Sequence, residues 1–229
     1  MSLKDAILQT LQPPQVNPFM EEQMHPWAKP CLHSCSQPLL RLWDDMSVSR
    51  IDKHGCMHAG APRKPLYTRE QRIKALGNHA DLGNNDPTPF ISFAYWKAAV
   101  EDFAAKRENK GIGSGLKRLT AINPNVRIYG GLPFVNMEHE MKHYGVVDPY
   151  GLSYKYYVDH YACLSAVTPE EVVCTWRWDA LLAAAGDDWY ERIVRPAFEA
   201  HHEAFIRDNP DAARPNAELM RGLGWPQFR

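Results

Sequence analysis

The sequence predicts an α+β fold with a mixed or antiparallel sheet and flanking helices. Strand-like and helix-like segments do not alternate regularly along the 229 residues, which argues against a doubly wound parallel sheet. Residues 170–179 (EEVVCTWRWD) alternate in two sets, as a half-buried antiparallel strand does. Residues 88–93 (TPFISF) read as a short buried strand, and apolar side chains at helical spacing follow directly from Ala94.

The remaining elements are predicted from periodicity and turn residues. Strands are expected at residues 38–45, 116–122, 125–131 and 155–164. Helices are expected at about Leu3–Leu11, Thr68–Leu76, Ala94–Arg107, 180–186 and 187–208. Asp179 and Asp187 are the expected N-caps of the last two, and Pro196 is expected to kink or split the last one. The resulting organisation is a helix and irregular arm over residues 1–36, a central domain over 37–178, and C-terminal helices over 179–229.

Composition narrows the class of protein. Hydrophobic residues make up 45% and charged residues 23% of the chain, as in ordinary globular proteins. The net charge of −1, without a basic block, argues against broad nucleic-acid binding and against an anionic membrane surface. No apolar run is long enough to span a membrane, and the charged start MSLKDAILQTLQ is a poor secretory signal. We therefore expect an intracellular, cytoplasmic protein, or a mature form from which a signal has been removed. Five cysteines, an odd number, suit a reducing compartment.

Two groups of histidines and cysteines could hold a metal. The segment HPWAKPCLHSC contributes His25, Cys31, His33 and Cys35, and HGCMH contributes His54, Cys56 and His58. Zinc accepts both side-chain types, but the two cysteines of the first segment are separated by three residues and no matching pair follows. Free thiols in a loop-rich segment are the favoured interpretation.

The sequence HEMKH matches the H-E-x-x-H pattern of zinc metallopeptidases, with His139 and His143 as ligands and Glu140 as the base. Three features argue against that function. The charged Lys142 lies inside the motif, the helix expected from about Phe134 to Tyr144 is short, and no third ligand is well placed. We expect no metal there and keep the peptidase as an alternative.

A second constellation is spread over four segments: Arg41 in LLRLWDD, His79 in GNHADLG, Ser92 in TPFISF, and His160 before the last strand pair. An arginine within an apolar strand is costly unless it meets an acid or an anionic ligand. The evidence for a functional site lies in the order and spacing of these segments, because each segment alone is weak evidence.

This order resembles the ADP-ribosyltransferase fold of the arginine–serine–glutamate type, as in the pierisin and scabin toxins, and is closer still to related fungal domains. In that group LYR, a His-Ala or His-Val pair, SPFVSTS and IPPEAIV occur in succession. The matching pieces here are LLR, NHA, TPFISFA and AVTPEEVV, over about residues 38–178. The resemblance implies a split sheet with flanking helices.

The resemblance also implies roles for single residues. Arg41 would hold the phosphates of NAD, a bidentate task suited to guanidinium. Ser92 would order the pocket and position the catalytic group, His79 would belong to the cofactor site, and Phe93 or Tyr95 would lie near the nicotinamide.

The sequence departs from the family pattern at the catalytic position. His160 stands where the family has glutamate, and histidine cannot supply a negative charge. Glu138 and Glu140 are the alternatives if the alignment is shifted. The expected function is an NAD-dependent mono-ADP-ribosyltransferase or NAD glycohydrolase with weakened catalysis, with a protein acceptor possible. The alternative is a catalytically silent module that binds a nucleotide or a protein.

Overall fold

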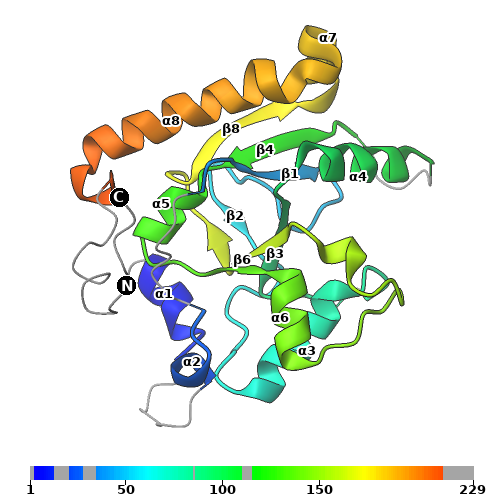
Figure 1. The fold of residues 1–229 in the computed structure, drawn as a ribbon, viewed down its shortest axis with the longest axis vertical. Coiled ribbons are helices and arrows are strands. Elements are labelled where there is room, and N and C mark those ends of the chain that lie inside the picture. Colours follow the sequence, from blue (N-terminus) through cyan, green and yellow to red (C-terminus); the bar gives the residue numbers. More distant parts are fainter. Residues whose placement is uncertain (1–2, 13–20, 28–34, 85, 110–114, 214–229) are drawn as a thin grey trace, which may run out of the picture.

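The computed structural model describes residues 3–12, 21–27, 35–84, 86–109 and 115–213. Its centre is a six-stranded antiparallel sheet with strand order β5-β6-β3-β1-β4-β8, accompanied by a two-stranded sheet of β2 and β7 (Figure 1). The strands are β1 (Leu39–Trp43), β2 (Met57–His58), β3 (Phe90–Ala94), β4 (Arg118–Ile122), β5 (Phe134–Asn136), β6 (His160–Leu164), β7 (Ala166–Val167) and β8 (Val172–Arg177). The α+β class and the antiparallel sheet with flanking helices are thus confirmed.

The helices flank the sheet in two groups. They are α1 (Leu3–Gln9), α2 (Glu21–Met24), α3 (Arg69–Ala80), α4 (Lys97–Asn109), α5 (Pro124–Tyr129), α6 (Met137–Tyr144), α7 (Trp178–Ala185) and α8 (Arg195–Asp208). In Figure 1, α7 and α8 run along the side of β8, whereas α3 and α6 lie below β3 and β6. Within the described ranges, none of the helices has the length and apolar character needed to cross a membrane.

The six-stranded sheet consists of two halves joined at one position. β1 pairs with β4, and β3 pairs with β6, along their whole lengths. Between β1 and β3, in contrast, the register contains only Leu40 opposite Ala94. The halves β5-β6-β3 and β1-β4-β8 therefore diverge beyond this pair.

Each half has its own apolar cluster beneath its helices. Phe90, Ala162 and Leu164 pack with α1, α3 and α6. Leu40, Leu42 and Leu119 pack with α4 and α7. The opposite face of the sheet carries a third cluster that spans both halves and includes β2 and β7: Leu39, Trp43, Met57, Ala59, Ile91, Phe93, Ile122, Cys163 and Val167. This arrangement leaves the split between β1 and β3 at the meeting point of all three clusters.

One predicted strand is wrong. Residues 125–131 (NVRIYGG) contribute to helix α5, although Val, Ile and Tyr favour strands. Asn123 caps the helix by accepting from the Asn125 amide, and Pro124 occupies its first turn, where a missing N–H costs nothing. The side chain of Arg127 is fully buried and binds Glu171 at 2.8 Å. Tertiary contacts therefore determine the helical structure of this segment, against its local preference for a strand.

Several element boundaries also differ from expectation. The helix of HEMKH begins at Met137 rather than Phe134, because Phe134–Asn136 pairs with β6. The strand expected at residues 155–164 begins only at His160, after a 3₁₀ turn at Lys155–Tyr157. The helix expected from Asp187 begins as a 3₁₀ turn and a π turn before α8 starts at Arg195, next to Pro196.

The start of α7 also differs from expectation. Asp179 is not its N-cap: Arg177 holds that position, and Asp179 lies in the first turn, where it accepts from the Ala180 amide.

Candidate functional site

Arg41 occupies the split between the half-sheets. Its Nη1 donates to the main-chain oxygen of Ser92 at 2.9 Å, and Nη2 donates to that of Ser49 at 3.4 Å. The side chain thus satisfies a carbonyl of β3 that a closed sheet would pair with main chain. Nε is buried without a hydrogen-bond partner, and no ion pair joins Arg41 to a carboxylate of the described residues. Burial, together with the charge of Arg107, lowers the pKa of Arg41 to about 10.

His79 links α3 to β3 through both ring nitrogens. Nε2 lies 2.8 Å from Ser92 Oγ, and Nδ1 lies 2.7 Å from Thr88 Oγ1. Burial lowers the pKa of His79 to about 3, with further contributions from His160 and Arg41. The ring is therefore neutral near neutral pH, so one of its nitrogens donates and the other accepts.

His160 begins β6 and lies opposite Ala94 of β3. Its ring is parallel to that of Tyr157, with centroids 6.2 Å apart, and its buried Nδ1 has no partner. Burial, and then the charge of Arg41, lowers the pKa of His160 to about 4. The side chain at the position that the family resemblance assigns to glutamate is therefore uncharged in the folded protein.

The structure places Arg41, Ser92 and His160 on three neighbouring strands, β1, β3 and β6. Strand alternation nevertheless divides their side chains between the two faces of the sheet. Ser92 and His160 alternate with members of the third cluster and so point toward the helix-covered face. Arg41 points to the face of Leu39 and Trp43, and it meets Ser92 through the main chain only.

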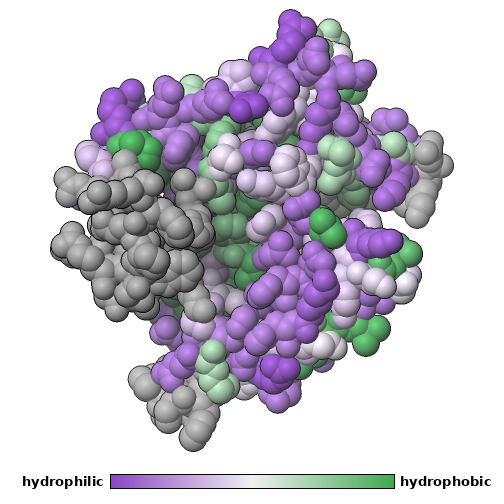
Figure 2. Space-filling model, viewed as in Figure 1, coloured by the Kyte–Doolittle hydropathy of each residue, from purple (hydrophilic) through white to green (hydrophobic). Residues whose placement is uncertain are grey.

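Partly buried aromatic side chains lie on the same face of the sheet as Arg41. Tyr95 and Phe134 each lie 5.7 Å from the ring of Tyr161, measured between centroids, and all three are partly buried at the edge of the third cluster. Phe93 is only 1% exposed, so it forms the base of the cluster and offers no surface to a ligand in this conformation. Figure 2 shows a hollow with apolar residues at its base, over the region where Figure 1 places β2 between the two half-sheets.

The alternative acids serve structural contacts. Glu138 pairs with Lys142 at 2.6 Å on the surface of α6. Glu140 is 7% exposed, and its Oε2 accepts from His25 Nε2 at 2.9 Å and from Trp27 Nε1 at 2.8 Å. Both carboxylates therefore lie on α6, away from the split strands.

The two histidines of HEMKH are exposed. His143 stacks on His25 with ring centroids 3.7 Å apart, while the buried Glu140 carboxylate is engaged by His25 and Trp27. Of the other candidate ligands, Cys31 and His33 lie outside the described residues.

Tyr161 and Phe134 were not identified from the sequence. The alternation of HYACL contains a usable signal, because Tyr161 must face opposite to His160 and hence toward the same side as Cys163. The contact of Phe134 with Tyr161 depends on the pairing of β5 with β6, which no local pattern reveals.

The sequence matches no protein-family model, and no curated protein is significantly similar to it. The site must therefore be interpreted from its own geometry.

Proposed function

We propose that this protein binds a dinucleotide of the NAD class in the hollow between the half-sheets, as an ADP-ribosyltransferase-like protein whose NAD cleavage is slow or absent. The observation that carries the proposal is the guanidinium of Arg41, which pairs with no carboxylate of the described residues and lies where the two half-sheets separate. The sequence order that resembles the arginine–serine–glutamate group supports the choice of ligand class.

The charge of Arg41 favours an anionic ligand. A guanidinium removed from water is costly unless an anion or several acceptors compensate it. Two carbonyl oxygens supply part of this compensation, but Nε–H lacks an acceptor. A phosphate supplies both the negative charge and the missing acceptor, with the geometry that guanidinium prefers.

The aromatic side chains favour a ligand with a flat ring. Tyr95, Tyr161 and Phe134 remain partly exposed on the face of the sheet to which Arg41 points. Stacking on such side chains is sequence-tolerant and contributes about 1–3 kcal/mol per base in nucleic-acid complexes. A cation and exposed aromatic rings on one face thus suit a molecule that joins phosphates to bases.

Slow turnover is expected because none of the three residues considered for catalysis, His160, Glu138 and Glu140, places a carboxylate beside Arg41. Cleavage of NAD to nicotinamide leaves a cationic sugar, which a carboxylate stabilises electrostatically. His160 is neutral and points away from Arg41, and Glu138 and Glu140 lie on α6. This observation favours a silent nucleotide-binding module as the second candidate function.

Calorimetric titration with NAD tests the proposal on the parent protein, Arg41→Gln and Arg177→Gln. Removing a partly buried charged contact typically costs about 2–5 kcal/mol, so Arg41→Gln should weaken binding by more than about tenfold. Arg177 is the matched control, because its side chain is 55% exposed and pairs with Asp179 at the far edge of the sheet. Equal affinity of the parent protein and Arg41→Gln, or no binding by the parent protein, would contradict the proposal.

A further inference from the structure

A tight hairpin before and within β2 brings three metal-ligating side chains together. Ile51 bridges Met57, the Asp52 amide donates to the Cys56 oxygen at 2.7 Å, and Gly55 turns the chain with φ +80°. A positive φ favours glycine at this position. Asp52 therefore lies across the hairpin from Cys56.

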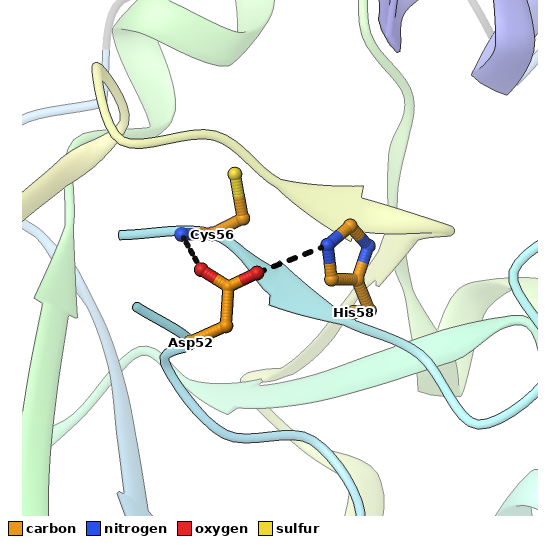
Figure 3. Close-up of side chains that lie close together, drawn as sticks. All are labelled: Asp52, Cys56 and His58. Carbon is orange, nitrogen blue, oxygen red and sulfur yellow. Dashed lines mark hydrogen bonds and ion pairs between the residues drawn. The ribbon is translucent and has the colours of Figure 1, made fainter. Parts of the chain in front are cut away.

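Cys56 and His58 are two residues apart in extended chain, so their side chains project from the same side of it. Figure 3 shows these two side chains above Asp52, which comes from the preceding segment. One carboxylate oxygen of Asp52, Cys56 Sγ and one ring nitrogen of His58 lie within 4.8 Å of one another.

We propose that Asp52, Cys56 and His58 form a Zn²⁺ site. Thiolate, imidazole and carboxylate are all zinc ligands, and this combination of soft and hard donors does not suit Ca²⁺ or Mg²⁺, which take oxygen ligands. The site consists of other residues than those proposed to bind NAD and does not depend on that proposed function.

The distance between two of the ligands fits a metal better than a direct contact. Asp52 Oδ2 and His58 Nε2 are 3.6 Å apart, too far for a hydrogen bond. With zinc–ligand bonds of about 2.0–2.3 Å, two ligands of a tetrahedral ion are separated by roughly 3.3–3.8 Å. The pair thus already has the spacing of one edge of a zinc tetrahedron, and Cys56 Sγ lies within 4.8 Å of both ligand atoms.

The hairpin also orients the carboxylate in advance. Asp52 Oδ1 accepts from the His54 amide at 2.8 Å and from the Cys56 amide at 2.9 Å. These bonds fix the carboxylate and leave Oδ2 directed at His58. Outer contacts of this kind are common around metal ligands, since they hold each ligand in one orientation.

Space for a fourth ligand is present beside the hairpin. Asp52 and His58 line an open surface cavity of about 500 Å³, together with Trp43, Arg50 and Arg118. The side chains of Asp52 and His58 are 35% and 47% exposed, so a metal ion can enter from solvent. A water molecule can therefore complete four-coordination, as in zinc sites with three protein ligands.

Cobalt and zinc titrations of chelator-treated, dialysed full-length protein test this site. The parent protein should bind one equivalent of Co²⁺ and show thiolate-to-cobalt charge-transfer absorption. One equivalent of Zn²⁺ should displace the cobalt and raise the unfolding temperature, because zinc binds the folded hairpin preferentially. Zn²⁺ should also protect Cys56 from alkylation, measured by mass spectrometry of the labelled peptides.

Matched variants locate the metal. Cys56→Ser should abolish the charge-transfer band and His58→Asn should weaken binding by more than about tenfold, a loss of about 1.4 kcal/mol or more. Cys174→Ser and His139→Asn should leave both properties unchanged, because each removes one thiol or one imidazole elsewhere.

Two results would overturn the assignment. One is failure of the parent protein to bind an equivalent of either metal at micromolar concentration. The other is metal that persists in both Cys56→Ser and His58→Asn, and its loss in His139→Asn would place it at HEMKH instead.

Discussion

Nε2 of His79 lies 2.8 Å from the hydroxyl of Ser92, and this contact fixes helix α3 to the strand that borders the split. Because the ring is neutral and its other nitrogen faces Thr88, both of its hydrogen-bonding positions are occupied. Ser92 thus positions the edge of β3 through its side chain, while its carbonyl receives Arg41.

We expect Ser92→Ala to destabilise the protein by about 1–3 kcal/mol, because a buried ring nitrogen loses its partner. Adding His79→Leu to this variant should cost less than the two single changes together, since no unpaired group then remains. Urea unfolding of the four proteins measures both quantities. Strict additivity would show that the two side chains do not act as a pair.

His160→Glu should leave nicotinamide release from NAD at the level of the parent protein. The new carboxylate would project to the helix-covered face, away from the face that carries Arg41 and the partly exposed aromatic side chains. His160→Gln provides the neutral control, and released nicotinamide is followed by chromatography. A marked rise in turnover for the glutamate variant alone would show that position 160 faces the ligand.

Acid should destabilise the protein through its two buried histidines. Their pKa values fall from an ordinary 6.5 to about 3 for His79 and about 4 for His160. Between pH 6.5 and these lower values, the unfolded chain binds more protons than the folded protein. The stability that the two neutral rings contribute is therefore fully present above about pH 6.5 and is lost as the pH falls toward 4. The slope is up to about 1.4 kcal/mol per pH unit for each ring.

Urea unfolding at several pH values between 7 and 4.5 measures this slope. His160→Gln should make it shallower by up to about 1.4 kcal/mol per pH unit, while other histidines contribute equally to both proteins. An unchanged slope in this variant would mean that folding does not lower the pKa of His160.

The buried ion pair of Arg127 and Glu171 should contribute strongly to stability. The two side chains are 0% and 1% exposed, and Arg127 also donates to the oxygens of Pro133, Leu164 and Ala166. Glu171→Gln leaves the buried guanidinium without its counter-charge, which should cost about 3–5 kcal/mol.

Asp179→Asn is the control for this prediction. It breaks the 2.6 Å pair with Arg177, whose two side chains are 55% and 60% exposed, and should cost less than about 1 kcal/mol. The two variants are compared with the parent protein by urea unfolding. Equal losses would show that burial does not determine the contribution of these pairs.

Local patterns predicted the parts of the fold that local interactions determine. The strand of TPFISF and the helix after it are confirmed as β3 and α4, and Gly145 ends α6 in the left-handed conformation. Arg41 lies in the middle of its predicted strand. In each of these cases, periodicity or cap chemistry is contained within a few residues.

Long-range contacts explain the failures. Residues 125–131 have strand propensity, but Arg127 is drawn into a buried network with Glu171 and the strand-end carbonyls. Glu140 is buried by His25 and Trp27, more than a hundred residues away in sequence. The separation of Arg41 from the His160 side chain depends on strand register, and a shift of one residue would reverse it.

The single register pair between β1 and β3 has a consequence for how the molecule opens. Each half-sheet, with its own helices, can behave as a cooperative unit, and the main-chain contact between the units is short. Amide hydrogens at the border between β1 and β3 should exchange with solvent sooner than those paired between β1 and β4 or between β3 and β6, since less structure must be lost to expose them. A molecule bound in the hollow would contact both units and hold them together. Its binding would therefore slow amide hydrogen exchange in β1 and β3 along their shared border.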